Sequence, residues 1–148
     1  MLKIALRYGG LMFIGFTIFF FLMHMIGMSD AMELRYLNVF IQFGVLWIAI
    51  RVWLREHPDQ FDNYTGAVAL GLMVTTIGAG AFAIFLILFL YANPELMAAM
   101  RAQSPRVIAE HLNPGMAGFF SFGEAIIAAL IGSYILIRII EAKYYRSV

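Results

Sequence analysis

Four long runs of apolar residues, separated by short polar segments, dominate the chain. They cover about residues 9–28, 36–54, 65–92 and 116–138. Each run is close to or longer than the roughly 20 residues that a helix needs to cross about 30 Å of hydrocarbon. The pattern predicts an all-α, polytopic membrane protein in which four transmembrane helices form an antiparallel bundle. Residues 1–148 are expected to form one domain, since no polar segment is long enough for a second.

The longest polar connection lies between the third and fourth runs and carries helix signals of its own. Asn93-Pro94 and Ser104-Pro105 each place proline where a helix can begin, and Asn113-Pro114 ends the segment. We therefore expect short amphipathic surface helices at about 94–112, in the outer loop. Their apolar positions, which include Met100, Val107, Ile108 and Leu112, favour contact with the bundle or with the membrane interface. The segment then either covers the mouth of the bundle or docks a partner.

Composition supports the membrane assignment. The chain is 63% hydrophobic and 13% charged, whereas soluble domains average about 45–50% apolar and about 25% charged residues. The absence of cysteine excludes disulfides and thiol chemistry. A net charge of +1 without a block of basic residues gives no reason to expect nucleic acid as a partner. The partners that remain are the lipid bilayer and either a membrane protein or a second copy of this chain.

The distribution of basic residues predicts the orientation. If the N-terminus is cytoplasmic, the outer side holds Arg35, Arg101 and Arg106. The inner side then holds the other seven, namely Lys3, Arg7, Arg51, Arg55, Arg138, Lys143 and Arg146. Basic residues favour the cytoplasmic side. Both termini are therefore expected in the cytoplasm.

Small residues recur at every fourth position of the third and fourth runs. Such ridges allow two helices to approach closely in lipid, where the hydrophobic effect does little to hold helices together. The pattern favours packing of these two spans against each other, with a seam for another chain as the alternative. The helix-packing residues are Ala67, Gly71, Thr75, Ala79 and Ala83 in the third run, and Ala117, Ser121, Ala125, Ala129 and Ser133 in the fourth.

One carboxylate, Glu124, falls inside the fourth apolar run. It lies about seven residues, or roughly 10 Å, from an outer boundary near Ala117. Gln42 in the second run has nearly the same predicted depth, so the two side chains are expected within hydrogen-bonding reach. The remaining members of this candidate intramembrane polar cluster lie slightly closer to the outer surface. They are His24, Asn38 and Ser121.

The polar cluster has two main interpretations. In the first, a neutral Glu124 bonds to Gln42 and holds helices together, which contributes about 0.5–2 kcal/mol. In the second, Glu124 binds a proton or cation, because ionisable side chains within membranes often line ion pathways. A contact with a missing subunit is a third explanation.

Other chemical motifs are lacking. The sequence holds no zinc-protease motif, nucleophile elbow, phosphate-binding loop or paired-acid motif. Glu56, His57, Asp59 and Asp62 cluster in one inner loop but are expected to form a solvated turn rather than a metal site. We expect no enzyme activity, no metal and no cofactor.

Several segments resemble a known family. They are the basic N-terminus, the inner loop LREHPDQFDNYTGAVALG, the NPELM start of the outer segment and the final IGSYILIRIIEAKYYR. Together these are similar to the bacterial four-span membrane family catalogued as domain of unknown function 4199. The resemblance implies a protein of the bacterial inner (cytoplasmic) membrane without an assigned activity. It therefore assigns no functional residues to this chain.

The function expected from all of this is an accessory or scaffolding role. A small helical bundle of this kind packs against a larger membrane complex or against itself. The alternative is a small oligomeric transporter or proton relay that uses Glu124.

Overall fold

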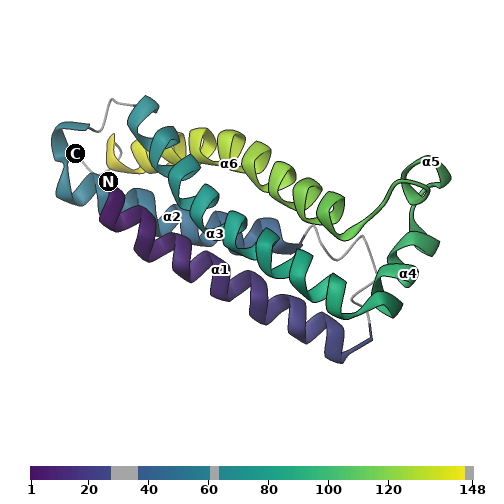
Figure 1. Cartoon of the computed structure of the whole chain (residues 1–148). Helices are drawn as coiled ribbons and strands as arrows, with labels where there is room; N and C mark the ends of the chain where they lie inside the picture. Colours follow the sequence, from purple (N-terminus) through teal and green to yellow (C-terminus); the bar gives the residue numbers. More distant parts are fainter. Residues whose placement is uncertain (28–36, 61–63, 146–148) are drawn as a thin grey trace.

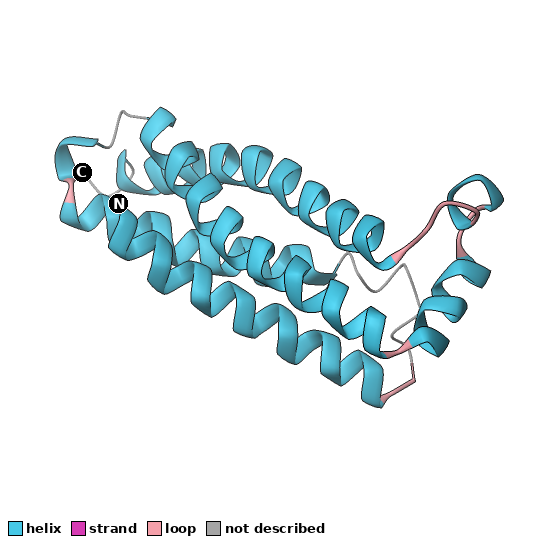
Figure 2. Cartoon of the chain, in the orientation of Figure 1, coloured by secondary structure: helices cyan, strands magenta, loops and turns pink. Residues whose placement is uncertain are grey.

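The computed structural model describes residues 1–27, 37–60 and 64–145. Within these residues the fold is helical and contains no strand (Figure 2). Four helices are long and apolar enough to cross a membrane. They are α1 (Leu2–Met25), α2 (Asn38–Glu56), α3 (Tyr64–Ala92) and α6 (Pro114–Tyr145). The predicted all-α class with four membrane-length helices is confirmed.

Three short elements complete the described chain. A 3₁₀ turn, η2 (Pro58–Gln60), follows α2. Helices α4 (Pro94–Gln103) and α5 (Arg106–Ala109) lie between α3 and α6 in the chain, and α5 is a single turn. Proline at the start of α4 sets the backbone for a helix without losing a needed donor.

The first and last long helices extend beyond the predicted spans. Helix α1 begins at Leu2 rather than near residue 9, and α6 continues to Tyr145 rather than ending near residue 138. The cause is amphipathicity at their ends. In α1, Ile4, Ala5 and Tyr8 are buried while Lys3 and Arg7 are exposed. A helical turn with one buried face continues the bundle even where charges interrupt the apolar run.

The four long helices form a bundle with a defined cyclic order. Helix α3 packs mainly against α6 and α1, and α2 packs against the same two helices. Helices α1 and α6 therefore occupy opposite corners, and α2 and α3 the other two. The start of α1 and the end of α6 lie at one end of the bundle, with α4 and α5 at the other (Figure 1).

A continuous apolar core fills the space between these helices. At one end, Trp53 and Leu54 are nearly inaccessible, and further along Leu46, Leu70 and Ala129 have no exposed surface. Phe16 and Phe82 extend the core with an edge-to-face contact at 5.5 Å between ring centroids. Contacts of this kind leave the interior closely packed.

Helices α4 and α5 cover the bundle only in part. Met97, Met100 and Leu112 are buried, as expected for a segment that rests on the bundle. Val107 and Ile108, which we expected on the same contact, are exposed at 81% and 41%. Of the four expected positions, only Val107 and Ile108 belong to α5, and this single turn has no buried residue. Arg101 connects α4 to the residues that follow α5, because its Nε donates to the carbonyl oxygen of Leu112 at 2.7 Å.

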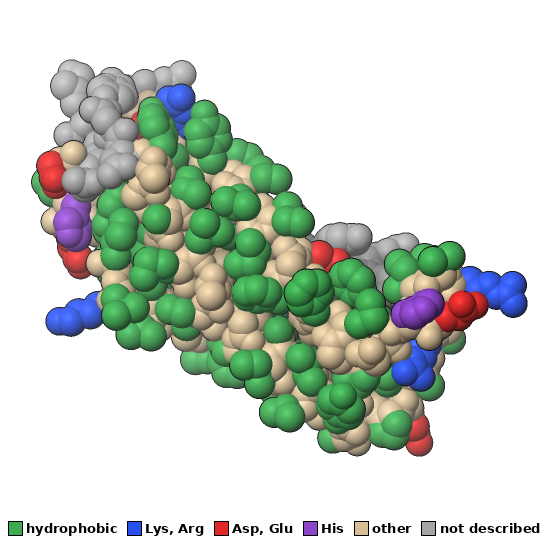
Figure 3. Space-filling model, turned by 45° about the horizontal axis from the view of Figure 1, so that its top comes forward, with side chains coloured by type: hydrophobic (Ala, Val, Ile, Leu, Met, Phe, Trp, Pro, Cys, Tyr) green, Lys and Arg blue, Asp and Glu red, His purple; other side chains and the backbone are tan. Residues whose placement is uncertain are grey.

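The surface of the bundle has an apolar middle and charged ends. Hydrophobic side chains cover the middle of the face in Figure 3, and charged side chains gather toward the two ends. Many large apolar residues are exposed along the four helices, including Ile14, Ile84 and Leu88. An apolar belt between charged ends suits a bilayer. Arg35 and Arg146, which entered the charge comparison, lie outside the described residues.

Candidate functional site

Gln42 is the buried polar residue at the centre of the candidate site. It extends from the second turn of α2 and is 1% exposed. Its Nε2 donates to the backbone oxygen of Ala125 in α6 at 2.7 Å, and a longer contact of 3.4 Å joins it to Thr75 Oγ1 in α3. One side chain thus links three helices, and a buried amide is stable only when it has such partners.

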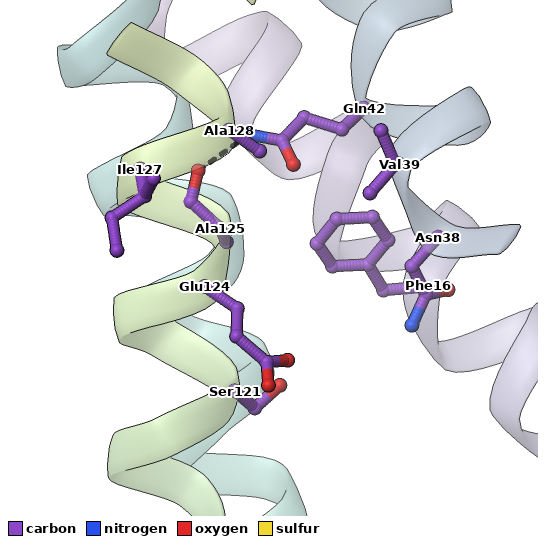
Figure 4. A pocket seen from close by; sticks show the side chains of 9 residues that line it. All are labelled: Phe16, Asn38, Val39, Gln42, Ser121, Glu124, Ala125, Ile127 and Ala128. Atoms are coloured by element: carbon purple, nitrogen blue, oxygen red, sulfur yellow. Dashed lines mark hydrogen bonds between the residues drawn. The ribbon is translucent and has the colours of Figure 1, made fainter. Parts of the chain in front are cut away.

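A pocket of about 300 Å³ lies beside Gln42, between α2 and α6 (Figure 4). Phe16 of α1 borders it, and Val39, Ile127 and Ala128 supply further apolar surface. Its polar lining consists of Asn38, Gln42, Ser121 and Glu124. The structure therefore brings four of the five predicted polar residues to one cavity.

Glu124 occupies the rim of this pocket. Its side chain is exposed, and its carboxylate points along α6 toward Ser121 (Figure 4). The amide nitrogen of Gln42, which we expected to pair with Glu124, instead donates to Ala125 and Thr75. This difference arises because residues 124 and 125 are about 100° apart around a helix, so only one of them can face the buried side on which Gln42 of α2 lies. Ala125 takes that position, and Glu124 is turned outward.

Asn38 and Ser121 are partly buried members of the lining. Asn38 is the first residue of α2, and its Oδ1 is buried without a hydrogen-bond partner. Ser121 lies one helical turn before Ala125 and is adjacent to Glu124 in the view of Figure 4. Both side chains can accept or donate at the pocket, depending on how the amide and hydroxyl are oriented.

His24 does not join the other four residues. It lies in the last turn of α1, where its ring stacks on Phe20 with centroids 6.3 Å apart. Phe89 of α3 meets the same ring edge-on at 5.6 Å. Equal depth along two helices does not bring side chains together when the helices face different ways, so His24 lies in an aromatic cluster on the α1–α3 side.

The predicted helix-packing residues belong to α3 and α6, two helices that pack against each other. All of them are buried except Ser121, which is partly buried. At the point of closest approach, a side chain added to Gly71 would overlap Ser133 of α6. A second close approach joins Gly118 of α6 to the carbonyl oxygen of Ala83, which an added Cβ would meet at 3.0 Å. Small residues let these two helices approach closely.

The structure contains a second polar cluster that the sequence analysis missed, near the opposite end of α6. Glu141 is 5% exposed, and its Oε2 accepts a hydrogen bond from the Tyr64 hydroxyl at 3.0 Å. Arg138 Nη1 donates to the same hydroxyl at 2.7 Å and lies 3.6 Å from Glu141 Oε2. The Arg138 guanidinium also stacks over the Tyr64 ring at 4.4 Å. The predicted fourth span ends at residue 138, three residues before Glu141.

The sequence contains a pattern that predicts a buried acid at this end of α6. Glu141 continues the four-residue spacing of Ala129, Ser133 and Ile137 along the buried face of α6. An acid on a continuing buried face indicates a paired carboxylate.

Among the described residues, no group of three His, Asp or Glu side chains is placed to hold a metal ion. His57 follows the last residue of α2, and its ring contacts the Trp53 carbonyl oxygen at 3.1 Å. Asp62 of the same loop lies outside the described residues. The polar groups that line the α2–α6 pocket can form hydrogen bonds and charge pairs.

Compared with protein-family models, with curated proteins and with solved structures, this chain matches none.

Proposed function

We propose that this chain is an accessory or scaffolding subunit of the bacterial inner membrane. Its four spans form an antiparallel bundle with both termini in the cytoplasm, and α4 and α5 lie on the outer side. It packs against a larger membrane complex or against a second copy of itself, and it carries out no catalysis. The excess of basic residues at the inner ends supports this orientation. The resemblance to the bacterial four-span family supports the compartment.

The packed interior is the observation that carries the accessory role. Gln42 uses its amide nitrogen to join α2, α3 and α6. The small residues of the α3 and α6 ridges are buried, apart from Ser121, which is partly buried. The centre is filled by large side chains such as Leu46, Leu70 and Ile137. A bundle built in this way favours holding a fixed shape over moving a solute through its middle.

Exposed apolar residues on several helices supply the surface for a partner. Ile14 on α1, Ile84 on α3 and Ile127 on α6 are each more than half exposed. A photo-crosslinking residue placed at each of the three, in cells, tests the proposal. We expect a discrete, reproducible protein adduct from one face and lipid adducts from the others. Lipid adducts at all three positions would contradict a stable protein partner.

A proton relay at Glu124 is the second candidate, and the cavity beside this carboxylate favours it. Proton flux measured in proteoliposomes distinguishes the proton relay from the accessory role. The accessory role predicts no proton flux from the wild-type protein and normal folding of Glu124→Gln. The relay predicts flux in the wild type that is lost in Glu124→Gln, because an amide does not exchange a proton near neutral pH. Such flux would overturn the accessory proposal.

A further inference from the structure

Two basic side chains from different helices lie at one aromatic ring. The Cζ atom of Arg51 is 5.5 Å from the centre of the Trp47 ring on α2, and the Nζ atom of Lys143 on α6 is 5.9 Å from the same centre. Both distances are within the roughly 6 Å of a cation–π contact. Helices α2 and α6 pack against each other. The ring therefore keeps two positive charges near each other, toward the end of the bundle at which α6 finishes (Figure 1).

These two positive charges have no acidic partner among the residues that the structure describes. Glu141, the acid two residues before Lys143, instead accepts a hydrogen bond from Tyr64 and lies 3.6 Å from Arg138. Arg51 and Lys143 are both exposed. A guanidinium group has five N–H donors and an ammonium group has three. The pair therefore presents positive charge and hydrogen-bond donors to an anion at the surface.

Exposed apolar side chains lie about one helical turn from each cation, toward the middle of the bundle. On α2, Ile48 precedes Arg51 by three residues, and on α6, Ile139 precedes Lys143 by four. Both isoleucines are exposed, and residues three or four apart share a helix face. The surface thus changes from apolar to positive within one turn on two neighbouring helices. A phospholipid with a net negative charge has the complementary order, with a phosphate group above its acyl chains.

We propose that this part of the α2–α6 surface binds the headgroup of an anionic phospholipid. The phosphate group contacts Arg51 and Lys143, and the Trp47 ring lies at the headgroup level, where tryptophan is favoured. The acyl chains follow Ile48 and Ile139. Basic sites between membrane helices recognise anionic headgroups, and a guanidinium group can bind a phosphate through two parallel hydrogen bonds. The inference requires only that the bundle crosses a membrane, and it depends neither on the accessory role nor on the orientation of the termini.

Tryptophan fluorescence of the full chain in lipid nanodiscs provides a local readout. The chain has two tryptophans, of which Trp53 is 2% exposed, whereas Trp47 is partly exposed. Brominated acyl chains quench a tryptophan that they contact, so quenching reports mainly on lipid at Trp47. Trp47→Phe measures the contribution of Trp53.

Two brominated lipids with identical acyl chains test the charge requirement. Phosphatidylglycerol has a net negative charge and phosphatidylcholine has none, and each replaces unbrominated phosphatidylcholine in steps. We expect the wild type to bind phosphatidylglycerol about tenfold or more tightly at this position, because each basic residue near an anionic headgroup favours it. Millimolar inorganic phosphate should not displace the lipid, since phosphate alone lacks the acyl chains that contact the apolar surface.

Four variants locate the preference. Arg51→Gln and Lys143→Gln should each lower it about fivefold, whereas Lys143→Arg retains the charge and should keep it. Arg7→Gln is the matched control. Arg7 is an exposed residue whose Cζ lies 5.7 Å from the centre of the Tyr8 ring on α1, the helix at the corner opposite α6. It removes the same charge from the same end of the bundle and should leave the preference at Trp47 unchanged.

The outcomes that would overturn the proposal are distinct. Equal quenching of the wild type by the two lipids would exclude a site for an anionic headgroup at Trp47. A loss in Arg7→Gln as large as in Arg51→Gln would assign the preference to the total charge of this end rather than to a site. Displacement by inorganic phosphate would identify a soluble phosphate as the ligand. None of these results bears on the presence of a protein partner, so the accessory role is tested separately.

Discussion

Gly71 of α3 lies directly against Ser133 of α6, so that a Cβ atom at position 71 would overlap the serine hydroxyl. Both residues are buried, and each belongs to the small-residue ridge of its helix. This contact sets how closely the two helices approach. Because close approach provides much of the packing energy between helices in lipid, changes here should affect the whole bundle.

Replacing Gly71 should therefore destabilise the protein. We expect Gly71→Val to lower the free energy of unfolding by about 1–3 kcal/mol, because the helices must separate to accommodate the side chain. Gly44 of α2 is the matched control, since a Cβ there meets nothing within 4 Å. Reversible unfolding in mixed micelles measures both. Equal tolerance of valine at the two positions would show that the α3–α6 contact is looser than the structure indicates.

Ala129 tests the same contact from the other helix. It has no exposed surface, whereas its neighbour Leu130 is 44% exposed. Ala129→Leu should cost about 1–3 kcal/mol of unfolding free energy by overpacking. Leu130→Ala changes the side-chain volume by a similar amount on the exposed face of α6, and it should lower the free energy of unfolding much less. A ranking in the reverse order would place the ridge against lipid.

Gln42 should contribute to stability through its shorter hydrogen bond. Gln42→Leu removes the donor to the Ala125 carbonyl and should lower the free energy of unfolding by about 0.5–2 kcal/mol. Thr75→Val keeps the shape of a buried side chain and removes only the partner at 3.4 Å, so its effect should be smaller. Thermal unfolding of the two variants gives the comparison. A larger loss for Thr75→Val would mean that the Thr75 contact is the more important one.

The buried carboxylate of Glu141 provides a prediction at the opposite end of α6. Tyr64→Phe removes the hydroxyl that donates to Glu141 Oε2 and accepts from Arg138, and it should cost about 1–3 kcal/mol because the acid remains buried with fewer donors. Tyr8→Phe, which removes a hydroxyl from another buried ring, is the control. Unfolding free energies that are equally affected in both variants would remove any special role for the Glu141 cluster.

The orientation can be tested without purification. Reporter fusions at Val148 should score as cytoplasmic and fusions near Gln103 as external, because seven of the ten basic residues then lie inside. An external signal at Val148 would require either an odd number of spans or a reversed bundle.

The sequence by itself determined the properties that depend on distance along one helix. The lengths of the apolar runs identified four membrane-length helices, since a bilayer of nearly constant thickness sets that length. Four-residue spacing identified the ridges that include Gly71 and Ser133, because residues four apart share a face. Depth along the spans also predicted Gln42 and Glu124 at nearly one level, with Asn38 and Ser121 slightly closer to the outer surface, and these four line one pocket.

Only the tertiary structure decided how each helix is rotated and which neighbour it faces. Rotation of α6 turns Ala125 toward Gln42 and Glu124 toward the pocket rim, and rotation of α1 puts His24 among aromatic rings. The burial of Glu141 likewise depends on how far α6 continues against the bundle. These outcomes follow from the packing of all four helices at once, which no pattern within a single helix contains.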